Sequence, residues 1–273
     1  MPNNASRAAS VTGTPADPAA EVGVYDEDRV RVVTIQRPTR RNAIAPATVA
    51  ALETALRDAA DNPGVGAVVL CGAGGHFSAG GDADAVLSAV RSGQDTDLLA
   101  LMRAYHRLVV EIWESPLPVV AAVSGSAYGG GLNLALACDL VVLSAEARLC
   151  QVFVQRGVVP DVGGAYLLPR LVGMQRAKEL MLLAPVIDAA RALELGLANA
   201  VEPDPRAALV RAIELATTLA QLPAYTVALS KKLMNHGLDT DLRSALELEA
   251  VSQAAALRSA AAAAGFEAIR KKR

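Results

Sequence analysis

Hydrophobic and polar residues alternate along residues 29–36, "RVRVVTIQ", with the two-residue period of a half-buried β-strand. Three later stretches, 65–72, 118–125 and 139–144, are short and almost continuously apolar, as is typical of strands that are buried on both faces. Residues 46–60 start with proline and stop before "DNPG", which predicts a helix. Because helical segments separate these strands, we expect crossover connections and a largely parallel sheet.

After about residue 170 the strand signal fades and helical periodicity dominates. One helical stripe is formed by Leu209, Ile213, Ala216 and Ala220. Residues 239–264 predict a single long helix that opens with an aspartate N-cap, and their richness in alanine would suit close packing against a neighbouring chain.

The chain therefore predicts three parts. Residues 1–20 are rich in Ala, Pro and Ser and are expected to be a disordered leader. Residues 21–200 are expected to form a β/α core, and residues 201–273 a helical C-terminal region used for trimerisation.

Composition excludes several classes of function. The chain has 273 residues, of which 52% are hydrophobic, enough for a sizeable core. Its formal net charge of −2 argues against a nucleic-acid surface, since such surfaces need clustered Lys and Arg. The apolar runs are interrupted well before the roughly 18 residues that a membrane helix requires, so no membrane span is expected.

The cysteines and the N-terminus indicate a cytoplasmic location. Cys71, Cys138 and Cys150 lie in apolar segments without metal-type spacing, so we expect buried thiols in a reducing compartment. The leader lacks the apolar region of a secretory signal.

A triple glycine in "SAYGGGLNLALACD", residues 126–139, is the first candidate for chemistry. It follows a predicted strand and precedes an apolar helix, so it places unhindered backbone N–H groups at a helix N-terminus, where developing negative charge is favoured. A lone triple glycine is equally well explained by close packing of a helix against a strand.

A second glycine-bearing loop favours the chemical explanation. Residues 71–86, "CGAGGHFSAGGDADAV", again connect an apolar strand to a helix. Two such loops would converge at one end of the sheet, where open α/β sheets bind ligands.

At this level of detail the chain resembles the enoyl-CoA hydratase/isomerase (crotonase) superfamily. The resemblance covers most of residues 30–200 and lies in "RPTRRNAI" (37–44), "GAGGHFSAGGD" (72–82), "PLPVVAAVSGSAYGGGLNLALACDLVVLSAEARL" (116–149), "GVVPDVGGAYLLPRLVG" (157–173) and "AKELMLLAPVIDAARALELGLANAV" (177–201).

The resemblance implies an α/β fold, a crotonase-like spiral of ββα units with a helical C-terminal region, assembled as a homotrimer or homohexamer. It also implies an acyl-CoA thioester substrate, with coenzyme A entering only as part of that substrate and with no metal or redox cofactor.

The resemblance further implies positions for the site. The backbone N–H groups of Ala79 and Gly130 would form an oxyanion hole for the thioester oxygen. Residues implied to bind CoA are Arg41, Ala43, Ala79, Gly80, Gly81 and Asp82, and residues expected at the acyl pocket are Tyr128, Asn133 and Phe153. Tyr128 would line that pocket or pack beneath it.

The acid–base residues depart from the pattern of typical hydratases, which carry two glutamates. Asn133 and Phe153 stand at those positions, and neither side chain transfers protons near pH 7. Asn133 is alternatively a partner in an ordinary hydrogen bond. His106 and Asp161 together resemble a dehalogenase pattern, although Phe153 replaces the tryptophan expected there.

Asp161, in "VVPDVGG", remains as the candidate proton shuttle. The resemblance implies this role, because superfamily isomerases carry an aspartate at the same position. One carboxylate is enough to take a proton from one carbon and return it to another. The alternative is that Asp161 only caps a helix that begins near Gly163. The sequence thus favours an isomerase that shifts a double bond in an enoyl-CoA; the alternatives are a hydratase that adds water to a 2-enoyl-CoA and a catalytically silent acyl-CoA-binding protein.

Overall fold

The computed structural model describes residues 20–271, so the leader expected over 1–20 lies almost entirely outside the described residues. Within them the strands form two sheets. The larger has the order β1-β2-β3-β4-β6-β9 and consists of β1 Val22–Glu27, β2 Val30–Ile35, β3 Ala67–Gly72, β4 Val119–Val123, β6 Leu140–Ser144 and β9 Ala200–Glu202. The smaller has the order β5-β7-β8 and consists of β5 Ser126–Tyr128, β7 Arg148–Cys150 and β8 Ile187–Asp188.

Helices connect the strands and form the whole C-terminal part. In the core they are α1 Pro46–Asp61, α2 Ala83–Ser92, α3 Asp95–Glu114, α4 Gly130–Ala137, α5 Gly164–Val172, α6 Met174–Lys178 and α7 Ala189–Glu194. They are followed by α8 Pro205–Ala220, α9 Ala224–Gly237, α10 Leu242–Leu257 and α11 Ala260–Lys271. Short 3-10 helices are η1 Pro38–Arg40 and η2 Val154–Arg156, and η3 Glu179–Leu183 is a π-helix.

The elements predicted from the apolar pattern are confirmed: the four strands are β2, β3, β4 and β6, and the helix is α1. In the large sheet β2, β3, β4, β6 and β9 pair in parallel, as the crossovers predicted. The exception is β1, which the pattern did not predict and which pairs antiparallel with β2 through a tight hairpin. Parallel pairing brings the carboxyl ends of the strands to one edge of the sheet, and this edge carries the site.

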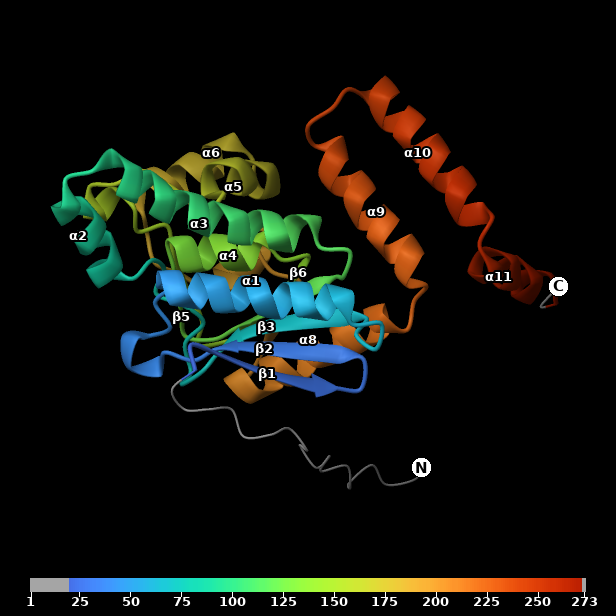
Figure 1. The fold of residues 1–273 in the computed structure, drawn as a ribbon, viewed down its shortest axis with the longest axis horizontal. Coiled ribbons are helices and arrows are strands. Elements are labelled where there is room, and N and C mark those ends of the chain that lie inside the picture. The colour runs from blue at the N-terminus through green and yellow to red at the C-terminus, as the bar shows by residue number, and fades with distance from the viewer. Residues whose placement is uncertain (1–19, 272–273) are drawn as a thin grey trace.

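Both faces of the large sheet are covered, which is why its strands are continuous apolar runs. Figure 1 shows α1 and α3 on one face and α8 on the other. The stripe of α8 that meets the sheet is made of small residues, Ala208, Ala212, Ala216 and Ala220, with Leu209 and Ile213 packed beside it. Alanine allows this helix to lie close to the strands. The three cysteines are free and buried, as predicted.

The single long helix predicted over 239–264 is wrong, because this segment forms two helices. Asp241 is the N-cap of α10, accepting hydrogen bonds from Arg243 N and Ser244 N. The chain then breaks at Ser259, whose hydroxyl accepts a hydrogen bond from Ala262 N at 3.2 Å and so starts α11.

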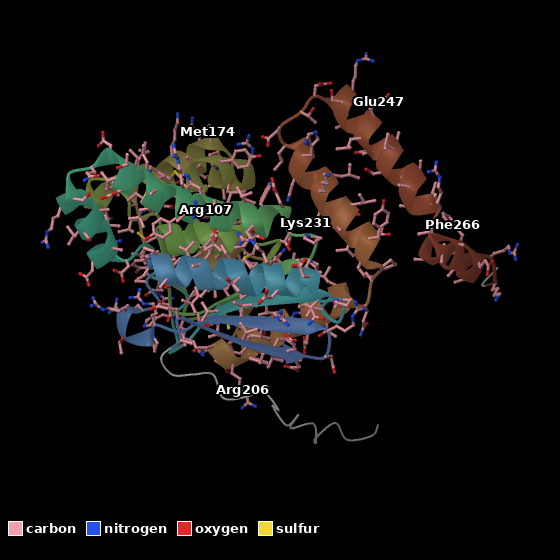
Figure 2. The ribbon with its side chains drawn as sticks, in the orientation of Figure 1. Arg107, Met174, Arg206, Lys231, Glu247 and Phe266 are labelled. Carbon is pink, nitrogen blue, oxygen red and sulfur yellow. The ribbon has the colours of Figure 1, made fainter. Side chains whose placement is uncertain are left out.

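The C-terminal arm, residues 224–271, lies beside the core rather than within it (Figure 1). α10 and α11 have no buried residue, and Figure 2 shows Glu247 and Phe266 on them, far from the sheet. α9 is anchored by Lys231, a buried side chain that donates to Ile112 O at 2.9 Å and pairs with Asp139 at 2.8 Å. Among residues 20–271, no helix combines the length and apolar character needed to cross a bilayer.

Candidate active site

The two glycine-bearing loops converge, as the sequence predicted. We call residues 72–82 the first glycine loop and residues 124–131 the second glycine loop. They are joined by backbone hydrogen bonds from Phe77 N to Ser124 O (2.8 Å), from Ser78 N to Ser126 O (3.0 Å) and from Tyr128 N to Ser78 O (3.0 Å). These bonds fix the two main chains relative to each other at the carboxyl edge of the sheet.

Glycine is required where the two loops touch. Gly80 has φ +90°, and a Cβ atom there would lie 2.7 Å from Tyr128 O and 3.3 Å from Gly130 N. A Cβ at Gly131 would lie 2.6 Å from Ser78 O. Only residues without a side chain allow this approach, so close packing and unpaired backbone N–H groups are two results of one arrangement.

The structure corrects the prediction that Ala79 supplies an oxyanion-hole donor. The Ala79 N–H donates to Arg41 O at 2.9 Å, so it is already used to hold the preceding loop in place. A group with a strong backbone partner is not free to receive a substrate oxygen.

Gly81 is the candidate donor instead of Ala79. Ile44 N donates to Gly80 O at 2.8 Å, and Asp82 N donates to Ile44 O at 3.0 Å. The peptide between Gly80 and Gly81 is trans, so the Gly81 N–H points opposite to the Gly80 carbonyl and away from Ile44. No acceptor for this N–H is found among the described residues.

Gly130 is the second candidate donor, at the position that the family resemblance implies. It is the first residue of α4, where a backbone N–H has no partner inside the helix. The N-cap, Gly129, has no side chain with which to cap it, and its φ of +51° is one that glycine adopts without strain. The dipole of α4 adds positive potential at this point.

One small cavity brings these groups together. Its lining consists of Ile44, Gly81, Tyr105, Leu108, Gly130, Leu134, Asp161 and Val162. Tyr105 was not singled out from the sequence, because an aromatic residue on an amphipathic helix carries no signal of a site. Its hydroxyl donates to Ile44 O at 2.9 Å, and burial, followed by the charges of Asp161 and Asp82, raises its pKa to about 12. It therefore remains a donor and secures the residue that flanks Gly81.

Asp161 is the carboxylate of this cavity. Its Oδ1 lies 3.6 Å from where a Cβ of Gly130 would be. That oxygen is buried and has no hydrogen-bond partner among residues 20–271. Burial raises the pKa of Asp161, while the charge of His106 opposes the shift. The raised pKa makes the carboxylate a better proton acceptor.

The alternative role of Asp161 as a helix cap is wrong. α5 begins at Gly164 with Gly163 as its N-cap, and no side chain caps it. Only the Asp161 carbonyl takes part, accepting from Gly164 N at 3.0 Å.

None of the three residues expected at the acyl pocket lines this cavity. Asn133 is fully buried and hydrogen-bonded, donating to Asp161 O at 2.8 Å and accepting from Gln151 at 2.7 Å, so the alternative of an ordinary hydrogen-bond partner describes it better. The side chain of Tyr128 packs against a small buried cluster of Cys150, Val152 and Ala184. Phe153 is buried against Gly129.

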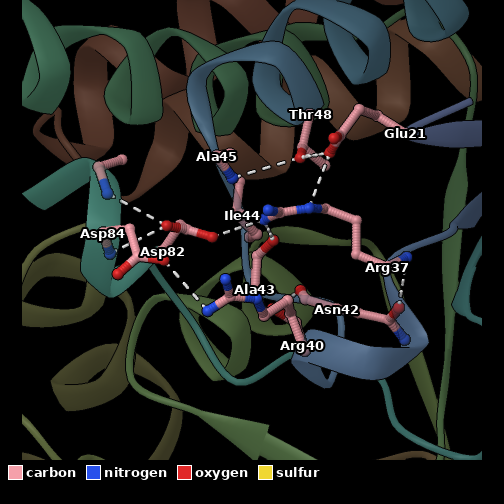
Figure 3. A network of polar contacts seen from close by, with 12 residues as sticks. Glu21, Arg37, Arg40, Asn42, Ala43, Ile44, Ala45, Thr48, Asp82 and Asp84 are labelled. Carbon is pink, nitrogen blue, oxygen red and sulfur yellow. Dashed lines mark hydrogen bonds and ion pairs between the residues drawn. The ribbon is translucent and has the colours of Figure 1, made fainter.

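A polar network holds the segment expected to meet CoA (Figure 3). Asp82 caps α2, accepting from Asp84 N and Ala85 N, and pairs with Arg37 at 2.8 Å. Burial opposes the ionisation of Asp82, but the hydrogen bond and charge of Arg37, with the two cap N–H groups, lower its pKa overall. The carboxylate of Asp82 thus has a structural role, and the backbone of Gly80 and Gly81 is what the first glycine loop presents.

The loop after β2 closes the network. Arg37 also donates to Ala43 O at 2.5 Å and forms an ion pair with Glu21 at 3.1 Å. Ala43 is buried, whereas Arg41 is exposed. Within the described residues no three His, Cys, Asp or Glu side chains lie close enough to hold a metal ion.

The fold and the site define an α/β enzyme in which two unpaired backbone N–H groups, those of Gly81 and Gly130, line one cavity with the buried carboxylate of Asp161. Comparisons with known proteins give the family. The enoyl-CoA hydratase/isomerase family matches residues 26–273, and the chain belongs to that family, with its crotonase fold.

Three relatives illustrate the match. A crotonyl-CoA hydratase of Syntrophomonas wolfei is 35% identical over 225 residues, which is 82% of this chain and 85% of the relative. A short-chain-enoyl-CoA hydratase of Clostridium acetobutylicum is 36% identical over 225 residues, 82% of this chain and 84% of the relative. The crystal structure of an enoyl-CoA hydratase from Polaromonas sp. JS666 shares 32% identity with a TM-score of 0.87, covering 92% of this chain and 97% of that one.

Proposed function

We propose that the protein is an enoyl-CoA isomerase that moves a double bond along the acyl chain of a CoA thioester. The observation that carries the proposal is the carboxylate of Asp161, whose Oδ1 is buried without a partner next to Gly130. A charge in such a place is costly for the folded protein, and a proton-transfer role gives the reason for keeping it there.

The proposed steps conserve every atom of the substrate. The thioester oxygen of a 3-enoyl-CoA accepts hydrogen bonds from the N–H groups of Gly81 and Gly130. Asp161 takes a proton from C2, and the negative charge spreads over the dienolate to the thioester oxygen. The same carboxyl returns the proton to C4, which leaves the double bond between C2 and C3.

No resident cofactor has a step in this scheme, because the thioester acidifies its own C2–H once its oxygen is held. For CoA itself we propose contact with the backbone of residues 79–82 and with Ala43, and with the exposed side chain of Arg41.

A hydratase is the second candidate, and the names of the relatives favour it. Hydration needs one group to activate water and another to protonate the adjacent carbon. Asn133 and Phe153 stand where the family resemblance expects the two glutamates, and both are buried here. A silent acyl-CoA-binding protein is the third candidate, and it has no need of the unpartnered Asp161.

One assay separates the three. Wild type and Asp161→Asn receive a 3-enoyl-CoA or a 2-enoyl-CoA, and the absorbance of the conjugated thioester is followed. Isomerisation makes absorbance grow from the 3-enoyl substrate in wild type only. Hydration removes absorbance from the 2-enoyl substrate, and binding without either change identifies the silent protein. Asp188→Asn, at the N-cap of α7, is the matched control, since that aspartate caps a helix through Arg191 N.

We also propose that the C-terminal arm joins three chains, as a homotrimer or homohexamer. Leu242, Val251 and Phe266 of the arm are 74%, 68% and 63% exposed, and apolar side chains of this size on adjacent helices favour a protein partner. Light scattering on the full chain tests the stoichiometry, and a monomer at micromolar concentration contradicts it.

A further inference from the structure

A chain of two buried side-chain amides ends at the backbone of Asp161. Gln151 Nε2 donates to Asn133 Oδ1 at 2.7 Å, and Asn133 Nδ2 donates to the Asp161 carbonyl at 2.8 Å. The exposed fractions of Asn133 and Gln151 are 0% and 2%, so no water competes for these bonds. Three separate parts of the chain, α4, the segment after β7 and the turn before α5, are thereby joined through one side chain, that of Asn133.

The direction of the amide chain follows from the acceptor at its end. A carbonyl oxygen only accepts, so Asn133 must turn its NH₂ group toward Asp161. Its oxygen then faces Gln151, which must also present its NH₂ group. A carboxylate at either position would place two acceptors face to face.

The turn that this chain holds is strained. Val162 has φ +50°, a left-handed conformation that a β-branched residue rarely adopts, and Gly163 follows with φ +74°. Such a conformation persists only where the surroundings fix it. The Asp161 carbonyl accepts hydrogen bonds from Asn133 Nδ2 and from Gly164 N, and these two bonds hold the turn in place.

The side chain of Asp161 has no comparable tie. Its Oδ1 has no hydrogen-bond partner among the described residues, so the place of the carboxylate depends on its own backbone. The next residue, Val162, packs directly against Gly130, because its Cγ2 lies 2.9 Å from where a Cβ of Gly130 would be. The strained turn therefore sets the position of the carboxylate relative to the oxyanion donor.

Gly164 leaves the room that the amide chain needs. A Cβ at this position would lie 2.2 Å from Asn133 Nδ2 and 2.6 Å from Oδ1. A side chain here would displace Asn133 from the Asp161 carbonyl. The sequence signal for this is the second glycine of "DVGG".

We propose that Asn133 and Gln151 are positioning residues, which hold the Asp161 turn so that its carboxylate faces the substrate carbon above Gly130. The proposal rests on the proposed function of Asp161 as the proton shuttle. Amides suit the task because they are neutral at every pH, and so they fix the turn without adding a charge beside the base.

The test compares wild type with Asn133→Ala, Gln151→Met and Asp161→Asn. Gln151→Met keeps the side-chain volume and removes only the brace behind Asn133. Asn199→Ala is the matched control, because Asn199 also joins distant segments through one side-chain bond, accepting from Val141 N at 2.8 Å. Three quantities are measured: kcat and KM with a 3-enoyl-CoA, and hydrogen exchange of the Gly164 amide in the ligand-free protein.

Positioning predicts that kcat falls by on the order of 10- to 100-fold in Asn133→Ala and by a smaller factor in Gln151→Met, because misplacement by about 1 Å has effects of that size. KM should stay within about threefold of wild type, since the donors that hold the carbonyl oxygen are unchanged. Exchange at Gly164 should become faster in both variants, while the control keeps the kcat and the Gly164 exchange of wild type.

The outcomes that overturn the proposal are separable. If Asp161→Asn is inactive while both amide variants retain wild-type kcat, positioning is refuted and the isomerase proposal stands. If Asp161→Asn turns over like wild type, the proposed function fails and this inference fails with it. A rise in KM at constant kcat, or unchanged exchange at Gly164, also refutes positioning. Should Asn133→Ala fail to fold, Gln151→Met decides alone by the same measurements.

Discussion

Two adjacent glycines in the first glycine loop should respond to alanine in opposite ways. Gly80 has φ +90° and faces the carbonyl of Tyr128, which an added Cβ would approach to 2.7 Å. Gly81 has no positive φ, and its added Cβ would make an ordinary contact of 3.5 Å with the Tyr105 hydroxyl. The same substitution therefore separates the contact between the loops from the mere presence of glycine.

The structure gives the size of the difference. The disfavoured backbone conformation of Gly80→Ala costs about 1–3 kcal/mol. The contact with Tyr128 O adds to this cost, because a backbone carbonyl held in a loop has no rotamer by which to move away. We expect Gly80→Ala to lose at least about 2 kcal/mol of unfolding free energy and about 4–8 °C in Tm. Gly81→Ala should stay within about 0.5 kcal/mol of wild type.

Thermal unfolding followed by circular dichroism measures the stabilities, and turnover of a 3-enoyl-CoA measures the site. Because Gly80→Ala pushes the two loops apart, its kcat should fall by on the order of 10-fold or more. If the two variants were equally stable, the close approach of the loops would be refuted. If Gly81→Ala unfolded well below wild type, the conclusion that an alanine fits at this position without strain would be refuted.

Three further predictions concern buried charges. Asp161→Asn should raise stability at neutral pH. Burial raises the folded-state pKa of Asp161, so the free energy of unfolding of wild type falls as pH rises from the ordinary aspartate pKa through the folded value. Urea unfolding across pH should show this slope only in wild type. Lys231→Met should lower the free energy of unfolding by about 3–5 kcal/mol, because it leaves the half-buried Asp139 without its cation. Urea unfolding measures this loss, and the unfolding curve of the exposed control Lys232→Met should match that of wild type. Arg37→Met should lower the free energy of unfolding by about 1.5–3 kcal/mol at pH 7. Because the pKa of Asp82 is lowered, the difference in unfolding free energy from wild type should shrink as pH falls through that lowered pKa. A difference that stays constant with pH would contradict the pairing of Arg37 with Asp82.

Much of the fold could be predicted because each element depends on local pattern. The strands of the large sheet are apolar because helices cover both faces, and Pro46 marks the start of α1 in the sequence itself. The break between α10 and α11 was missed because Ser259 lies in an alanine-rich stretch whose periodicity continues on both sides. The hydrogen bond from Ala262 N to the Ser259 hydroxyl is the local feature that starts the second helix.

The sequence was enough to name the loops of the candidate site, but not the backbone atoms that are free in them. The sequence pointed to the two glycine loops and to Asp161, while the choice between Ala79 and Gly81 depends on which peptide Arg41 and Ile44 engage. Those partners lie more than thirty positions away along the chain. The burial of Lys231 against Asp139 likewise joins residues that no local pattern connects.

In the proposed reaction one carboxylate, that of Asp161, carries the proton from C2 to C4. The most direct measurement supplies a 3-enoyl-CoA labelled with deuterium at C2 and locates the label in the product by mass spectrometry and NMR. Wild type should give a 2-enoyl-CoA with part of the deuterium at C4, because the buried carboxyl returns the same atom before solvent replaces it. Asp161→Asn should give no product. A product that carries only solvent hydrogen at C4 and that forms equally fast with Asp161→Asn, or a hydrated product, would contradict the proposed reaction.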